Sequence, residues 1–317
     1  MLHHGFTALD VPIRPTAGLP HMTTSPTYTT AAPPDPAGNA LGTYRALRLG
    51  MPLLVGLLGL AVVADAGRSD WCFQTSISAY RFSAISSVFV GVVVALGACL
   101  IVYRGNTDTE DVLLDVAGFL ALVVAVVPTG RPGPGCAAVV DDTASASGVR
   151  TSVAALLVTA VVAVIVAWLL RRRSGIDRRS RTGIAARILG AAIVGVVVVT
   201  FAFPDFFLRY AHGYSAVTLF VLIGLVVACN AYLAARQHSS WKSPYAVVYT
   251  TISAAMILTA AVVVVVHLWT RWPYAIFVVE AALLAEFAAF WLVQTKELWN
   301  VDDRRCLISS QVPLTPL

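Results

Sequence analysis

Three carboxyl groups lie about one turn or more inside apolar stretches of this sequence, and they are the first candidates for chemistry. Glu286 lies near the middle of the run 274–295, and Glu280 lies about half as deep in it. Asp115 lies about one turn inside the run 112–129. Ionisable residues at such positions are costly, so they are functional candidates by default. Two interpretations stay open: a proton or cation relay, or carboxyls that are neutral or bonded to a neighbouring helix.

Glu280 and Glu286 cannot act as an acid–base pair on one helix. They are six positions apart, which turns them by about 600° around a helix axis, so they lie on different faces. Each therefore needs a partner from another run. The candidates are hydroxyl and amide side chains of the two preceding runs: Thr250, Thr251, Ser253, Thr259 and Asn230.

Eight long apolar runs position these residues and fill most of positions 46–298. Each is about long enough to cross a bilayer as a helix, since about 20 residues span the apolar core. In lipid a helix is favoured even for Val-rich runs, because it satisfies its backbone hydrogen bonds within one segment. We predict an all-α fold, a polytopic membrane bundle of about eight transmembrane helices. The runs are 49–66, 84–103, 112–129, 151–170, 184–203, 213–235, 246–267 and 274–295.

The composition supports a membrane protein. The 317 residues are 58% hydrophobic and 12% charged, whereas about 25% is usual for charged residues in soluble domains. The net charge of +5 does not indicate nucleic-acid binding, because the arginines stand in short loops between apolar runs. Membrane lipid is the expected partner.

Lysine and arginine counts predict the orientation. Placing the arginine-rich loop 171–181 in the cytoplasm puts sixteen of the 22 Lys and Arg residues on the inner side, with both chain ends. We therefore expect a protein of the inner cell membrane with cytoplasmic termini. The loop arginines either contact anionic lipid or only fix the topology. They are Arg171, Arg172, Arg173, Arg178, Arg179 and Arg181.

Two of the five cysteines fall in predicted outer loops. Cys72 and Cys136 would both face an oxidising compartment, where disulfides persist. We predict a Cys72–Cys136 bridge, and the alternative is two unrelated thiols. Neither has a Cys or His partner at zinc-binding spacing, so we predict no metal site, and no cofactor motif is present.

The first predicted outer loop, 70–81, is rich in hydroxyl, aromatic and basic side chains. One interpretation is a contact with lipid headgroups or a substrate. The other is an interfacial helix cap whose aromatic side chains lie at headgroup level. The contact candidates are Trp71, Ser78, Tyr80 and Arg81.

Part of the chain resembles a group of uncharacterised bacterial multi-pass membrane proteins. The resemblance covers roughly residues 72–130. It rests on Ser76-Ile77-Ser78-Ala79-Tyr80, Asn106-Thr107-Asp108, Glu110-Asp111-Val112-Leu113-Leu114 and Val126-Val127-Pro128-Thr129. It implies a multi-pass membrane protein and no particular activity. After Tyr80 the chain departs from the pattern of the group, with Arg81-Phe82-Ser83 in place of further tyrosines.

A short segment before the second apolar run resembles a second family. Asp70-Trp71-Cys72 is similar to the start of alkaline ceramidases, which are zinc hydrolases of membrane lipids. Such an enzyme also needs two late histidines one turn apart, but His212, His238 and His267 stand in different segments. A zinc-bound water then has no site.

Both ends of the chain are predicted to be tails outside the membrane bundle. Residues 1–45 are rich in Pro, Thr and Ala and predict a disordered tail, and 299–317 form a second cytoplasmic tail. Met22 is an alternative translation start.

The sequence favours a transport-like function, for a small solute or coupled to protons. Short loops, many spans and the intramembrane glutamates support it. An accessory or sensory protein that acts through partners remains the alternative. A membrane-embedded lipid enzyme is the third, although neither a nucleophile set nor a metal set is present.

Overall fold

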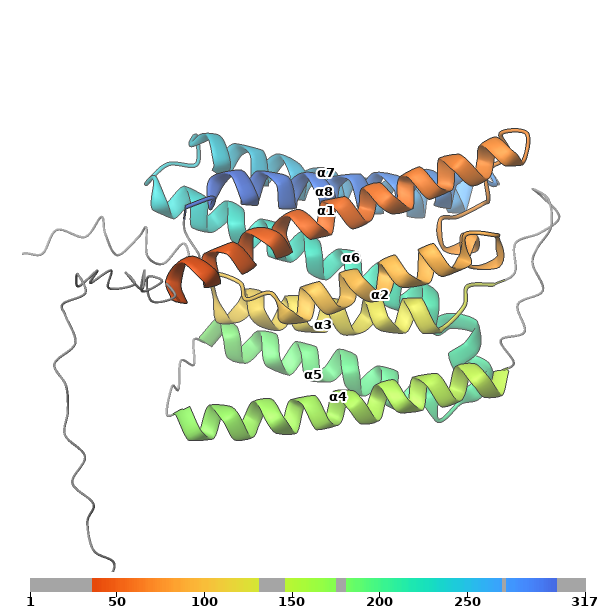
Figure 1. Cartoon of the computed structure of the whole chain (residues 1–317), viewed down its shortest axis with the longest axis horizontal. Coiled ribbons are helices and arrows are strands. Elements are labelled where there is room, and N and C mark those ends of the chain that lie inside the picture. The colour runs from red at the N-terminus through yellow and green to blue at the C-terminus, as the bar shows by residue number, and fades with distance from the viewer. Residues whose placement is uncertain (1–35, 131–145, 175–180, 270–271, 301–317) are drawn as a thin grey trace, which may run out of the picture. The chain divides into compact units, whose positions relative to one another are not determined.

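A computed structural model describes residues 36–130, 146–174, 181–269 and 272–300 (Figure 1). These residues form eight α-helices and one 3-10 helix, η1, and no strand. Apart from the first residue of α1, they belong to the compact unit Ala37–Leu317. The elements are α1 (Pro36–Arg68), η1 (Ser78–Phe82), α2 (Ser86–Val102), α3 (Asp108–Val126), α4 (Ala146–Ser174), α5 (Arg181–Phe201), α6 (Pro204–Gln237), α7 (Pro244–Trp269) and α8 (Ala275–Glu297).

The predicted all-α class is confirmed, and most of each predicted apolar run lies on one of the eight helices. Six of the described helices are long and apolar enough to cross a membrane: α1, α4, α5, α6, α7 and α8. The other two differ for physical reasons. Helix α2 has only 17 residues, and the first turn of α3 carries three acidic residues, Asp108, Glu110 and Asp111.

One predicted boundary differs from the structure. Residues 36–45, which we assigned to the N-terminal tail, belong to α1. This segment has mostly small or polar side chains, yet it is held by contacts to aromatic rings that hydropathy does not reveal. The ring of Tyr44 packs edge-on against Tyr103 at 5.7 Å, and the Arg45 guanidinium lies over the Trp299 ring at 4.7 Å. Met22 and both predicted tails beyond these residues lie outside the described ranges.

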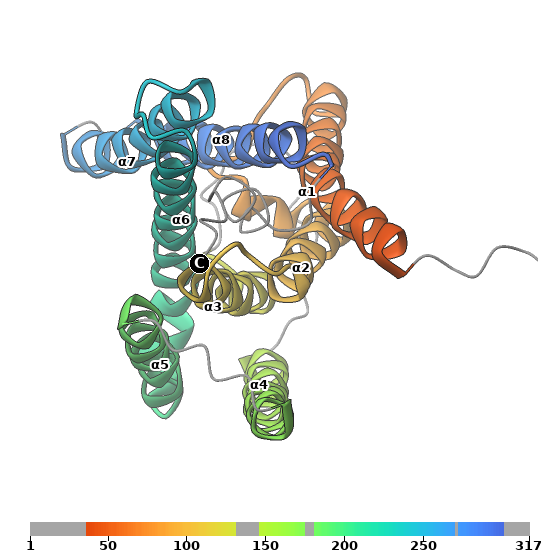
Figure 2. The same ribbon diagram turned by 90° about the vertical axis from the view of Figure 1, so that its left-hand side faces the viewer.

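The α-helices run alternately up and down, so their termini gather at two ends (Figure 1). We call one the η1 end, where α1 finishes and α2 and α8 begin. The other is the Asn230 end, where α3 begins and α6 and α8 finish. Viewed from the Asn230 end, α1, α2, α3, α6 and α8 form a ring, while α4, α5 and α7 lie outside it (Figure 2).

Helix α3 is the centre of the packing, and it contacts α2, α5 and α6 extensively. The approach of α2 is especially close at Gly97 and Gly118. A Cβ at Gly97 would lie 2.9 Å from the Gly118 carbonyl oxygen, and one at Gly118 would lie 2.5 Å from the Gly97 oxygen. Small residues allow such backbone contact between membrane helices.

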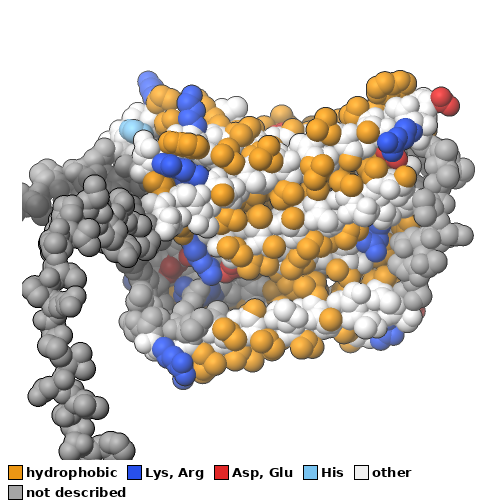
Figure 3. Space-filling model, in the orientation of Figure 1, with side chains coloured by type: hydrophobic (Ala, Val, Ile, Leu, Met, Phe, Trp, Pro, Cys, Tyr) orange, Lys and Arg blue, Asp and Glu red, His pale blue; other side chains and the backbone are white. Residues whose placement is uncertain are grey.

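The outer surface of the bundle is apolar. Many valine, leucine and isoleucine side chains of α4 and α5 are exposed, including Val164 at 68% and Ile188 at 67%. The face in Figure 3 has hydrophobic side chains along its middle and Lys and Arg toward its two ends. Water does not tolerate apolar surface on this scale, and lipid does. The chain is therefore a multi-pass membrane protein.

Candidate functional site

A network of buried polar side chains lies at the Asn230 end, and Asn230 is its centre. The Asn230 Oδ1 accepts hydrogen bonds from Gln294 Nε2 at 3.1 Å and from Asn106 Nδ2 at 3.3 Å. Its Nδ2 donates to Glu110 Oε1 at 3.3 Å and to the Val226 carbonyl oxygen at 3.0 Å. This amide thus uses both donors and both acceptor positions. Asn230 is fully buried, and Asn106, Glu110 and Gln294 are at most 3% exposed.

The network continues to a buried arginine of α1. Tyr103 Oη donates to Gln294 Oε1 at 3.3 Å and accepts from Arg48 Nε at 3.0 Å. Arg48 Nη1 donates to the Leu298 carbonyl oxygen at 3.0 Å, just beyond the end of α8. A chain of neutral polar groups thus joins the cation of Arg48 to the carboxyl of Glu110. Hydrogen bonds linked in such a chain strengthen one another in low-dielectric surroundings.

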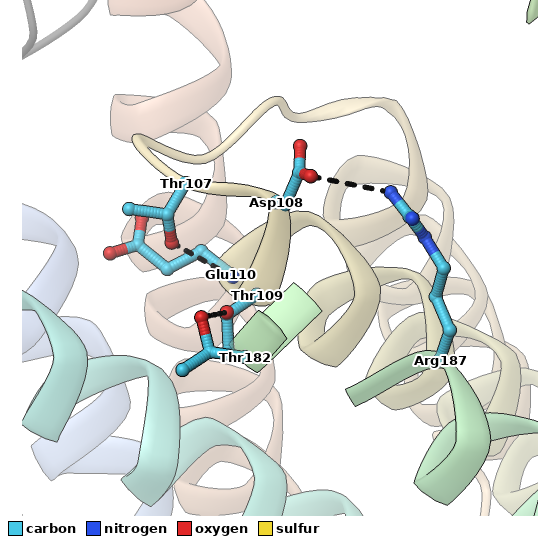
Figure 4. Close-up of polar contacts among 6 residues, drawn as sticks. All are labelled: Thr107, Asp108, Thr109, Glu110, Thr182 and Arg187. Atoms are coloured by element: carbon cyan, nitrogen blue, oxygen red, sulfur yellow. Dashed lines mark hydrogen bonds and ion pairs between the residues drawn. The ribbon is translucent and has the colours of Figure 1, made fainter. Parts of the chain in front are cut away.

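The start of α3 explains why Glu110 points inward. Thr107 is the N-cap: its hydroxyl accepts from the Glu110 N–H at 3.2 Å (Figure 4). The Glu110 carboxylate turns back and accepts from the Asn106 N–H at 2.7 Å. This is close to a capping box, in which the acidic side chain returns to the N-terminal backbone. The carboxylates of the first turn also favour the positive end of the helix dipole.

The same turn connects α3 to α5. Asp108 forms an ion pair with Arg187 at 3.4 Å, and the Thr109 and Thr182 hydroxyls lie 3.2 Å apart (Figure 4). These contacts are partly exposed and hold the first two turns of α5. Asp115, the candidate that the sequence gives on α3, lies 3.7 Å from Arg104, and its side chain is 38% exposed. Asp115 is therefore a partly exposed, ion-paired carboxyl rather than a buried one.

The sequence did not reveal this network. Lysine and arginine counts use Arg48 only to predict the orientation, and the sequence indicates no role for Gln294, Tyr103 or Asn106. It predicts Asn230 as a possible partner for the glutamates of α8, whereas in the structure Asn230 contacts Gln294 on that helix. Amides within apolar runs and the Thr107–Glu110 spacing were the available signals. Neither signal identifies which helices meet.

At the η1 end, Glu280 of α8 holds the segment that precedes η1. Its Oε2 accepts from the N–H of Ile77 at 2.6 Å and of Ser78 at 3.1 Å, and its Oε1 accepts from Ser78 Oγ at 3.1 Å. A second link runs from the Phe277 N–H to the Thr75 carbonyl oxygen at 3.1 Å. No Lys, Arg or His in the described part of the chain forms an ion pair with Glu280.

The predicted loop 70–81 is thus folded into the bundle instead of lying on its surface. Tyr80 is fully buried, and Ser78 is 7% exposed. Burial raises the pKa of the Tyr80 phenol, and the hydrogen bond from the Gln74 N–H partly offsets this. Arg81 Nη1 donates to the Ala125 carbonyl oxygen at 2.6 Å. Of the four contact candidates, Trp71, at 68% exposed, is the one placed at the surface.

An apolar cavity of about 80 Å³ lies inside the ring of helices. One water molecule needs about 10–15 Å³ on the same scale. The polar side chains that line the cavity are Glu280 and Ser78, at the η1 end, and the other lining residues are apolar. These are Leu58, Ile77, Phe89, Val93, Leu96, Leu100, Ala121, Val124, Ala216, Leu219, Phe220, Ile223, Leu284 and Phe287.

Glu286 lies apart from this cavity. Its Oε1 accepts a hydrogen bond from Thr259 Oγ1 of α7 at 2.8 Å, and its Oε2 is buried with no hydrogen-bond partner in the described residues. Thr259 is one of the candidate partners that the sequence predicts. The two glutamates thus face different elements, η1 and α7, which their spacing predicted. This geometry does not connect them in one polar path.

The cysteine and arginine predictions are only partly within the described residues. Cys72 is disulfide-bonded, whereas Cys99 and Cys229 are free thiols. Cys136 lies outside the described ranges, so its pairing with Cys72 stays a prediction. Arg178 and Arg179 also lie outside them. Arg172 and Arg173 are exposed at the end of α4, where the Arg172 guanidinium lies 3.7 Å from the centre of the Trp168 ring, and Arg181 is exposed at the start of α5.

Comparison with known proteins gives no further guide to the site. No protein-family model, no curated protein and no solved structure matches this chain. Among the described residues, no group of three or more His, Cys, Asp or Glu side chains is placed to hold a metal ion. The chemistry must therefore be inferred from the cavity and the two polar ends.

Proposed function

We propose that this protein is transport-like: it binds a small, mainly apolar solute within the membrane and moves it between the two sides. The observation that carries the proposal is the cavity inside the ring α1, α2, α3, α6 and α8, with polar groups at one end only. Ligand sites in helix bundles are typically concave and apolar, with few polar groups that orient the ligand. At the opposite end of the ring, the hydrogen-bonded network around Asn230 holds the helices together and closes the space between them.

We place the protein in the inner cell membrane, with the Asn230 end toward the cytoplasm. Exposed Arg172, Arg173 and Arg181 are at this end, next to the rest of the arginine-rich loop. Basic residues are retained on the cytoplasmic side of membrane proteins. Both termini then lie inside, and the loop arginines contact anionic headgroups.

An accessory role remains the second candidate, and the surroundings of Glu286 favour it. A relay would need further polar groups next to this carboxyl, whereas one threonine contacts it in the described residues. Such a single contact is what a scaffold between α7 and α8 requires. We therefore expect Glu286→Gln to leave proton flux unchanged, and place the solute site at Glu280 instead.

Filling the cavity tests the proposal. Ala216 lines the cavity, and Ala254 is an exposed alanine of α7 that serves as a matched control. Benzyl alcohol, an apolar ring with one hydroxyl group, matches the apolar walls and the single polar end of the cavity. Thermal unfolding in lipid nanodiscs should show stabilisation of the wild type and of Ala254→Phe with rising probe concentration, since a ligand of the folded state raises its stability. Ala216→Phe should lose this response.

If wild type and Ala216→Phe respond alike, the cavity is not a solute site. The accessory role would then be the better account of the fold.

A further inference from the structure

We propose that the solute of this cavity is a small organic cation, an ammonium group attached to an apolar body. The inference rests on the proposed function and specifies its ligand. It follows from the contrast between the wall of the cavity, which is apolar, and the single carboxyl group of Glu280 at its η1 end.

The hydrogen bonds of Glu280 leave its negative charge without a counterion. Two backbone N–H groups and one hydroxyl donate to it, and all three come from Ile77 and Ser78. These donors are neutral, and no basic side chain of the described residues forms an ion pair with it. A carboxylate can accept about four hydrogen bonds, so one position remains for a ligand. A cation at this position supplies the missing positive charge.

The walls suit an organic cation better than a metal ion. Calcium and magnesium require six or more oxygen ligands, whereas the side-chain oxygens lining the cavity belong to Glu280 and Ser78. Three aromatic residues, Phe89, Phe220 and Phe287, line the same space. Aromatic rings attract ammonium groups and pack well against apolar bodies. An organic anion would meet the carboxylate and find no basic residue in the lining.

Three probes of nearly equal size but different charge test this directly. Benzylammonium, benzyl alcohol and benzoate would each be titrated into the wild-type protein in nanodiscs of zwitterionic lipid at pH 7. Binding is measured by calorimetry and by thermal unfolding. We expect benzylammonium to bind about 10-fold or more tightly than benzyl alcohol, because charge pairs in dry sites produce differences of at least this size. Benzoate should show no saturable binding.

Variants assign the preference to one carboxyl. Glu280→Gln keeps the shape of the side chain and removes its charge, so benzylammonium affinity should fall to that of benzyl alcohol. Glu286→Gln is the matched control, since this glutamate is on the same helix but does not line the cavity. It should keep the full preference. Glu280→Asp keeps the charge and should retain part of the preference.

The outcomes separate this inference from the proposed function. Equal affinities of wild type for benzylammonium and benzyl alcohol, with both lost in Ala216→Phe, would overturn the cation preference and keep the solute site. Binding that is insensitive to Ala216→Phe would overturn both. Should Glu280→Gln fail to fold, the comparison of the three probes on the wild-type protein still decides the charge of the ligand.

Discussion

The two polar regions of this bundle differ in how their buried groups are satisfied. At the Asn230 end, side chains from α1, α3, α6 and α8, together with Tyr103 and Asn106, satisfy one another. At the η1 end, Glu280 is satisfied by the backbone and one hydroxyl of a short segment. The first arrangement ties several helices together, and the second ties one loop to one helix and borders a cavity.

The difference indicates that one end of the bundle is rigid and the other can move. A fully satisfied network in low-dielectric surroundings is rigid, since moving any member leaves the others unpaired. A short segment that few hydrogen bonds hold, here those to Glu280, Phe277 and Ala125, can move while the helices stay in place. Solute exchange is therefore expected at the η1 end, with the Asn230 end as the fixed base.

The largest effect should come from removing the centre of the network. Asn230→Leu leaves Gln294 Nε2, Asn106 Nδ2 and Glu110 Oε1 without this partner. At about 1–3 kcal/mol for each unsatisfied buried group, we expect a loss of roughly 4 kcal/mol in the free energy of unfolding. Denaturant unfolding in detergent micelles measures it. Tyr232→Phe, half exposed on the same helix, should change stability by less than about 0.5 kcal/mol. A loss for Asn230→Leu as small as that of the control would remove the network as the rigid base.

The predicted disulfide is the second test, and it concerns the η1 end. Cys72 lies between α1 and η1, so a bond to Cys136 would tie this segment to the loop that follows α3. Peptide mass spectrometry without reduction should recover a Cys72–Cys136 pair. Cys136→Ser should lower the free energy of unfolding by about 3 kcal/mol, as loss of a bridge between distant positions does. Finding both thiols free would contradict the pairing.

How much the sequence could predict differs between the two ends. The apolar runs predicted the eight helices, because span length and backbone hydrogen bonding leave few alternative structures in lipid. The spacing of Glu280 and Glu286 placed them on different faces. The network of Arg48, Tyr103 and Gln294 could not be predicted, because it depends on which helices are neighbours and at what depth. Helical periodicity gives the face of a residue but not the residue opposite it.

Loop 70–81 shows the same limit. Its Trp71, Ser78 and Tyr80 resemble an interfacial segment by composition. The structure instead buries Ser78 and Tyr80, because Glu280 offers acceptors to the backbone of residues 77 and 78. A carboxyl on one span and a loop some 200 positions away have no local signal that connects them.

Releasing the loop should cost less than breaking the network. Glu280→Leu leaves two backbone N–H groups without their acceptor, so we expect a loss of about 2 kcal/mol. The loss should be local. Ser76 is 7% exposed in the native protein. In a Ser76→Cys background, a membrane-impermeant maleimide should therefore label the Glu280→Leu variant faster than the Ser76→Cys parent. Asn230→Leu in that background serves as the comparison. If it accelerates labelling as much as Glu280→Leu does, the two ends are not independent.

The smallest effect should be at Glu286. Thr259→Val removes one hydrogen bond between α7 and α8 and keeps the shape of the side chain. Interhelical hydrogen bonds in membranes average about 0.6 kcal/mol, so the change in the free energy of unfolding should be close to this value. The double variant Thr259→Val with Glu286→Gln should cost little more than either single change, since both remove the same contact. A loss of more than about 2 kcal/mol would mean that Glu286 has partners beyond Thr259 and belongs to a third polar region. A small loss would show that Glu286 belongs neither to the Asn230 network nor to the polar groups of the η1 end.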